Sequence, residues 1–118
     1  MIDVRTTFTP FKMKLSRKEP VDLTLVLKNS GNETEILSFD IELGQQFSFE
    51  RSGFKNIISK RIAEFKPGDS KKIYFEIWPK QMVRAGEQPI RLTVIEHYRG
   101  FNYVKRKQVK MLRLGVED

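Results

Sequence analysis

The residues best suited to chemistry gather between positions 97 and 113, where aromatic rings lie close to cations. Aromatic rings can stack on nucleic-acid bases or sugars, and neighbouring Lys and Arg side chains can bind phosphate groups. The same cations on an edge strand would instead keep that strand from pairing with another chain, and this is the interpretation we favour. The candidate binding residues of this segment are Tyr98, Arg99, Phe101, Tyr103, Lys105, Arg106, Lys107 and Lys110.

A second pair of rings, Tyr74 and Trp78, lies in a segment of alternating apolar residues. If Phe75 and Ile77 face the core, both rings lie on the opposite, outer face. Large rings exposed on a sheet often mark a contact surface, and carbohydrate is one ligand that we consider. As an equal alternative, Trp78 packs beneath the loop 79–86.

Patterns for catalysis or metal binding are sparse. The chain has no cysteine, which excludes disulfides, thiolate catalysis and cysteine-based metal sites. The one histidine, His97, excludes a multi-histidine metal centre, and we interpret it as an ordinary strand-end residue. The turn at 29–35 lacks the carboxylate spacing of a calcium loop, and no glycine-rich phosphate loop occurs. We therefore expect a protein that is not an enzyme and that uses no cofactor and no metal.

The elements that position these residues belong to one domain, because 118 residues correspond to a single hydrophobic core. Hydrophobic residues make up 39% of the chain and charged residues 31%, which excludes a disordered chain and a membrane span. The net charge is +7, and the whole excess lies in residues 60–118. Such an asymmetry bears on partners rather than on fold. The high charged fraction, rich in Glu, favours a heat-adapted source.

Apolar residues alternate with polar ones along most of the chain, which predicts half-buried β-strands. Val109 and Met111 alternate in one phase and Leu114 and Val116 in the other, so we expect a β-bulge near Met111. Pro-Gly-Asp at 67–69 predicts a turn. The clearest alternating runs are 21–27, 37–43, 73–77 and 90–94.

This pattern indicates seven or eight strands with turn residues every eight to twelve positions, and no long amphipathic helix. The alternation leaves one face of each sheet exposed to solvent. Such a sheet is antiparallel, because a parallel sheet is covered by helices on both faces. We therefore predict an all-β fold, an immunoglobulin-like antiparallel β-sandwich formed by residues 1–118.

The chain also resembles the CARDB-type immunoglobulin-like domains of bacteria and archaea over roughly residues 15–97. The similarity is carried by the runs VDLTLVLKNSGNETEILSFDIEL, FKPGDSKKIYFEIWP and AGEQPIRLTVIE. In that family a strand ends in an Asn-x-Gly turn, a Pro-Gly-acidic turn opens a later strand, and a Gly-led strand follows. The resemblance implies a non-catalytic module that is commonly repeated in tandem in surface proteins.

We therefore expect a non-enzymatic interaction or structural module with a protein partner. Two alternatives remain open: a module that binds nucleic acid or another polyanion through the basic C-terminal hairpin, and an accessory domain that contacts carbohydrate. The segment 1–5 lacks the apolar run of a secretion signal. We expect a cytoplasmic location if the chain is complete, and a cell-surface or extracellular one if it was excised from a longer protein.

Overall fold

The alternating apolar residues form β-strands throughout the computed structural model, which describes residues 1–118. A short 3-10 turn, η1 (Leu15–Arg17), interrupts them, and there is no α-helix. None of the elements is therefore a helix with the length and apolar character that a bilayer span requires. The strands are β1 (Ile2–Thr9), β2 (Lys12–Lys14), β3 (Val21–Asn29), β4 (Glu35–Glu42), β5 (Phe47–Ser48), β6 (Ile57–Phe65), β7 (Ser70–Pro79), β8 (Gly86–His97) and β9 (Val104–Glu117).

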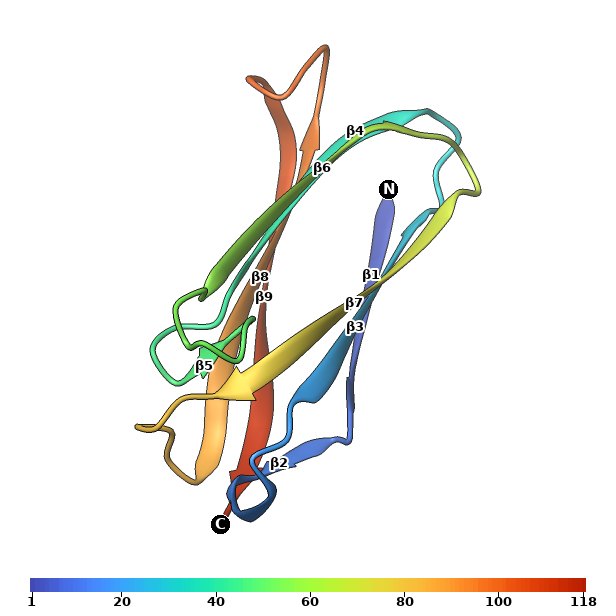
Figure 1. The fold of residues 1–118 in the computed structure, drawn as a ribbon. Helices are drawn as coiled ribbons and strands as arrows, with labels where there is room; N and C mark the ends of the chain where they lie inside the picture. The colour runs from blue at the N-terminus through green and yellow to red at the C-terminus, as the bar shows by residue number, and fades with distance from the viewer.

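The strands form two sheets that pack face to face (Figure 1). One sheet has the order β1-β3-β7-β5, and the other has the order β2-β9-β8-β4-β6. All neighbours are antiparallel except β2 and β9, which run parallel. The β8–β9 hairpin extends beyond the body of the sandwich at one end (Figure 1), and the molecule measures 47 × 24 × 19 Å. The predicted all-β sandwich is thus confirmed.

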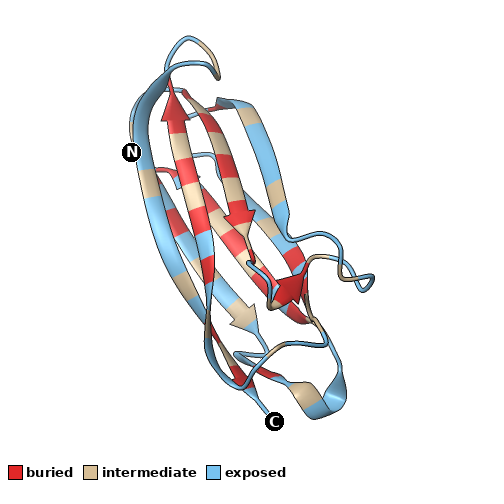
Figure 2. Cartoon of the chain, turned by 90° about the vertical axis from the view of Figure 1, so that its left-hand side faces the viewer, coloured by how far each residue is buried: buried red, intermediate tan, exposed pale blue.

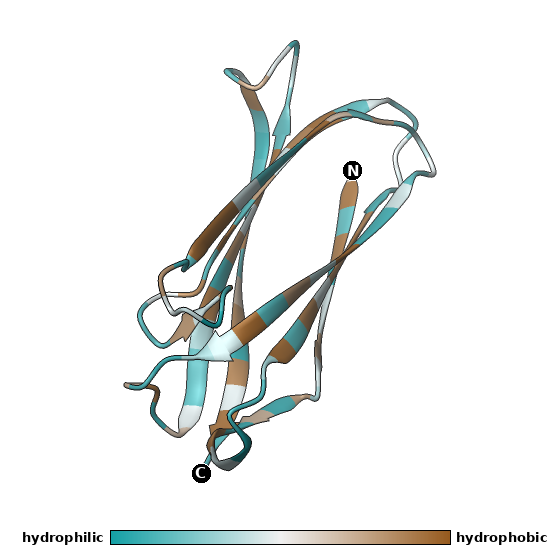
Figure 3. Cartoon of the chain, in the orientation of Figure 1, coloured by the Kyte–Doolittle hydropathy of each residue, from teal (hydrophilic) through white to brown (hydrophobic).

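The core lies between the sheets and contains twenty buried hydrophobic residues. The strands β3 and β4 alternate between buried and half-buried or exposed residues, as the period of two requires (Figure 2). Hydropathy alternates in the same way along the ribbon (Figure 3). Leu25 on β3 and Leu92 on β8 are almost fully buried, one from each sheet. The predicted inward phase of these runs is therefore confirmed.

Three details differ from the sequence-based expectations. The strand count is nine, because β1 and the short β2 precede the first strand that the sequence pattern indicates. The bulge predicted near Met111 is wrong, since β8 and β9 stay in register through that residue. The register shifts instead between Glu96 and His97, where one extra β9 residue is inserted. Val109 and Met111 simply point away from the core and are exposed.

Two turns that are far apart in sequence contact each other at one end of the sandwich. The backbone N–H of Asn29 donates to the carbonyl of Asp69 at 3.0 Å, and that of Gly68 donates to the carbonyl of Asn29 at 2.9 Å. The buried Asn29 amide donates to the carbonyls of Glu33 (2.7 Å) and Phe65 (2.9 Å) and accepts from the backbone N–H of Gly31. Asn29 therefore joins the ends of β3, β6 and β7.

Candidate binding surfaces

The tip of the β8–β9 hairpin presents two of the predicted aromatic residues together. The rings of Tyr98 and Tyr103 lie 5.3 Å apart between centroids, and each is about half exposed. Arg99 is exposed beside them and adopts a positive φ of 65°. The structure therefore brings the two tyrosines and one cation to a common exposed tip.

Phe101 folds back from the tip onto the outside of the five-stranded sheet. Its ring makes an edge contact with His97 at 5.3 Å, and the guanidinium of Arg61 lies 4.8 Å from its centroid. His97 is buried beneath it and donates from Nδ1 to the carbonyl of Tyr103 (3.0 Å), while Nε2 is 2.7 Å from the hydroxyl of Ser38. Both ring nitrogens of His97 are thus engaged within the chain.

The register shift redirects Lys105 toward the buried end of β4. A bulge turns the extra residue away from the regular alternation, and the Lys105 ammonium donates to Glu35 Oε1 at 2.9 Å. Glu35 is almost completely buried, so this cation supplies its counter-charge. The hydrogen bond to Glu35 raises the pKa of Lys105 above its ordinary value of 10.5, and burial opposes the rise. Lys105 is therefore part of an internal ion pair.

Two more cations of β9 have partners within the chain. Arg106 Nε lies 3.9 Å from the buried carboxylate of Glu96. The Lys110 ammonium donates to the carbonyl of Val4 on β1 at 2.9 Å, and the Gln108 amide donates to that of Ile2 at 3.1 Å. These last two bonds satisfy carbonyls of an edge strand that would otherwise be free to pair with another chain.

The side of the five-stranded sheet that points away from the core is named the outer face here. The cross-strand register places Ile57, Glu42, Arg91 and Met111 in one row across β6, β4, β8 and β9. Val109 lies in the next row and Lys107 in the row after it. The cations Lys107 and Arg113 are exposed on this face and have no ion-pair partner.

Tyr74 and Trp78 differ in exposure and in surroundings. Tyr74 is 62% exposed on the outside of the four-stranded sheet, with the Lys72 ammonium 5.6 Å from its ring. Trp78 is half-buried beside the loop after Pro79, and it lines a hollow of about 390 Å³. The second of the two expected positions for Trp78 agrees with this placement.

We name this hollow the Trp78 pocket. Three segments that are distant in sequence contribute cations to it: Lys18 follows η1, Arg51 follows β5, and Lys80 follows β7. The Arg51 guanidinium lies 6.0 Å from the indole ring. The sequence contains no signal for this cluster, because strand alternation does not fix where loops meet. The remaining lining residues are Leu15, Pro79, Gln81 and Val83.

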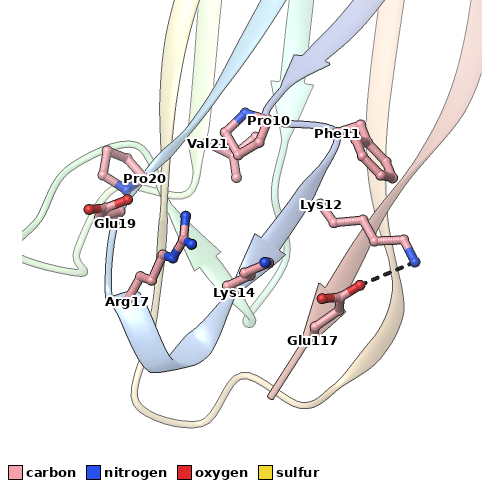
Figure 4. Close-up of a pocket in the computed structure, with 9 residues that line it drawn as sticks. All are labelled: Pro10, Phe11, Lys12, Lys14, Arg17, Glu19, Pro20, Val21 and Glu117. Atoms are coloured by element: carbon pink, nitrogen blue, oxygen red, sulfur yellow. Dashed lines mark ion pairs between the residues drawn. The ribbon is translucent and has the colours of Figure 1, made fainter.

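A neighbouring pocket of about 310 Å³ lies between β2, η1 and the start of β3 (Figure 4). Phe11 and two prolines form its apolar walls, and Lys12 pairs with Glu117 at 3.3 Å. Lys14 and Arg17 line the space without an ion-pair partner. The lining therefore mixes both signs of charge with apolar groups.

The chain has no cluster of three or more His, Cys, Asp or Glu side chains that could hold a metal ion. The turn at 29–35 instead uses Asn29 for the backbone contacts described above. No protein-family model matches the chain, and no curated protein matches it in sequence.

Proposed function

We propose that this protein is a non-enzymatic interaction module that docks an acidic protein partner on the outer face of its five-stranded sheet. The observation that carries the proposal is a set of four exposed large apolar side chains on this face. Ile57, Val104, Val109 and Met111 lie on it and are 47%, 55%, 53% and 54% exposed. Exposed apolar side chains gathered on one face are typical of contact surfaces.

The opposite sheet provides the contrast. Its outward positions on β3 and β7 carry mostly polar or charged side chains, such as Asp22, Lys72 and Glu76, and Tyr74 is its one strongly exposed large apolar residue. A polar surface of that kind is well solvated and does not need to be covered by a partner. The difference between the two faces therefore favours the outer face as the docking surface.

The charges of the outer face indicate the partner's chemistry. Glu42 is paired with Arg91, and Asp40 accepts a hydrogen bond from Ser59. The cations Lys107 and Arg113 flank the exposed apolar pair on β9 and remain unpaired. An acidic partner would complement them, and it would also be attracted by the net charge of +7.

The immunoglobulin-like and CARDB-type assignment belongs to the same proposal. An immunoglobulin-like sandwich has strands A, B, E and D in one sheet and C, F and G in the other. The order β1-β3-β7-β5 and the neighbours β4, β8 and β9 fit that scheme. The direct contact of the Asn29 turn with the Pro-Gly-Asp turn supports the resemblance, because these turns carry its motifs.

The test selects peptides from a random phage-display library by their binding to the purified protein. We expect the enriched peptides to combine Asp or Glu with an apolar residue. Met111→Lys should weaken their binding by about tenfold or more, as expected for a residue that makes a main apolar contact. The pair Lys107→Glu and Arg113→Glu should have a similar effect.

A matched control makes the same charge change on the opposite sheet, with Lys28→Glu and Lys72→Glu. These substitutions should leave peptide affinity unchanged. The proposal is wrong if no peptide is enriched, if the peptides lack acidic residues, or if they bind the Met111→Lys variant as well as the original protein.

A second proposal is the binding of nucleic acid or another polyanion by the hairpin tip. The exposed Tyr98–Tyr103 pair beside Arg99 supports it, because stacked bases need accessible rings. Tyr103→Ala should then weaken binding of a single-stranded oligonucleotide by about 1–3 kcal/mol. Unchanged affinity in a fluorescence titration would exclude this function.

A further inference from the structure

The Trp78 pocket combines a planar ring with an excess of positive charge. Lys18, Arg51 and Lys80 line it, and no Asp or Glu does. None of the three cations takes part in any ion pair of the chain. Like charges in one hollow repel one another, and an anion bound among them would remove that repulsion.

The geometry of the pocket also restricts the ligand's shape. Its volume of about 390 Å³ lies in the range of small-molecule sites. The indole of Trp78, with Leu15 and Val83 nearby, forms an apolar wall on which a planar ring can stack. The Arg51 guanidinium lies 6.0 Å from the indole centroid, and its planar set of N–H donors suits phosphate oxygens.

Lys18 supplies an independent observation. It adopts a left-handed backbone conformation with a φ of 52°, which strains a residue that has a Cβ and which glycine adopts freely. Lysine at this position lowers stability relative to glycine, yet it adds a cation to the pocket. A residue that costs stability at a concave, charged site is consistent with a role in binding.

We propose that the Trp78 pocket binds a nucleoside phosphate, with the base against the indole and the phosphate among Lys18, Arg51 and Lys80. This site lies outside the outer face and does not depend on the docking proposal. Either function can therefore fail without the other.

Trp78 is the only tryptophan, so intrinsic fluorescence excited where adenine does not absorb reports this pocket alone. ADP should change the emission in a saturable way, whereas adenosine should bind at least about tenfold more weakly, because it lacks the charged group. Lys80→Ala should weaken ADP binding by about tenfold. Lys107→Ala, the matched control on the outer face, should leave it unchanged.

Lys18→Gly separates binding from folding. It should raise the thermal midpoint because it removes the strained backbone, and it should nevertheless weaken ADP binding. Equal affinity for adenosine and ADP, or full ADP binding by Lys80→Ala, would overturn the proposal. Tighter binding of a single-stranded oligothymidylate than of ADP would also overturn it, because the cations would then serve a nucleic-acid strand.

Discussion

Asn29 should contribute strongly to the stability of the fold, because its buried side chain joins the β3–β4 turn to the end of β6. The amide donates two hydrogen bonds to the carbonyls of Glu33 and Phe65 and accepts one from the backbone N–H of Gly31. Asn29 is completely buried, so water cannot replace these partners. Each bond contributes about 1 kcal/mol, and an orphaned buried carbonyl adds a further cost. We expect Asn29→Ala to lower the free energy of unfolding by about 2–4 kcal/mol.

Urea denaturation followed by circular dichroism measures this change, and for a domain of this size the thermal midpoint should fall by about 10–20 °C. Asn29→Asp should destabilise more at neutral pH, because it places a carboxylate against two carbonyl oxygens. Asn32→Ala is the matched control: it lies in the same turn, is exposed, and should change stability by less than about 0.5 kcal/mol. A loss below about 1 kcal/mol for Asn29→Ala would show that these hydrogen bonds contribute little to stability. A thermal midpoint that calcium raises would show that the turn is a metal site instead.

Three further predictions concern the core and two lysines of β9. Leu25→Ala should lower the free energy of unfolding by about 2–5 kcal/mol in urea titrations, because the side chain is fully buried, and a loss below about 0.5 kcal/mol would contradict the observed register. The raised pKa of Lys105 means that its pair with Glu35 contributes fully below pH 10.5 and is lost as the pH rises through the folded-state pKa. The stability of Lys105→Met should therefore decline less steeply above that pH in denaturation curves, and parallel curves would exclude the pair as a contributor. Lys110→Met should cost about 1 kcal/mol and increase concentration-dependent association in sedimentation runs, because it frees the Val4 carbonyl at an edge; an unchanged monomer would argue against the edge role.

The alternation of apolar and polar residues was sufficient to predict the sandwich, because each strand buries one face and exposes the other. Leu25 and Leu92 illustrate this. The pattern was weaker in β1, where Thr6 and Phe8 follow Ile2 and Val4 and are only half-buried. That strand lies at a sheet edge, where a strict apolar phase is not required.

The candidate sites were less predictable than the fold. A bulge at Lys105 cannot be distinguished by alternation from one near Met111, because both change the phase of the same strand. Three of the cations counted as potential ligands, Lys105, Arg106 and Lys110, turned out to have partners inside the chain. The contacts of Lys105 with Glu35 and of Lys110 with Val4 join residues 70 and 106 positions apart. The second contact also crosses from one sheet to the other, so it depends on how the sheets pack. The basic cluster around Trp78 depends on loop packing in the same way.

We propose the outer face of the five-stranded sheet as the docking surface. Amide hydrogen exchange with a library-selected acidic peptide bound and absent tests it most directly. We expect slower exchange on β9, β8, β4 and β6, strongest around Val109 and Met111, with β1, β3 and β7 unaffected. Protection confined to β3 and β7, or to the hairpin tip at Tyr98 and Tyr103, would contradict it.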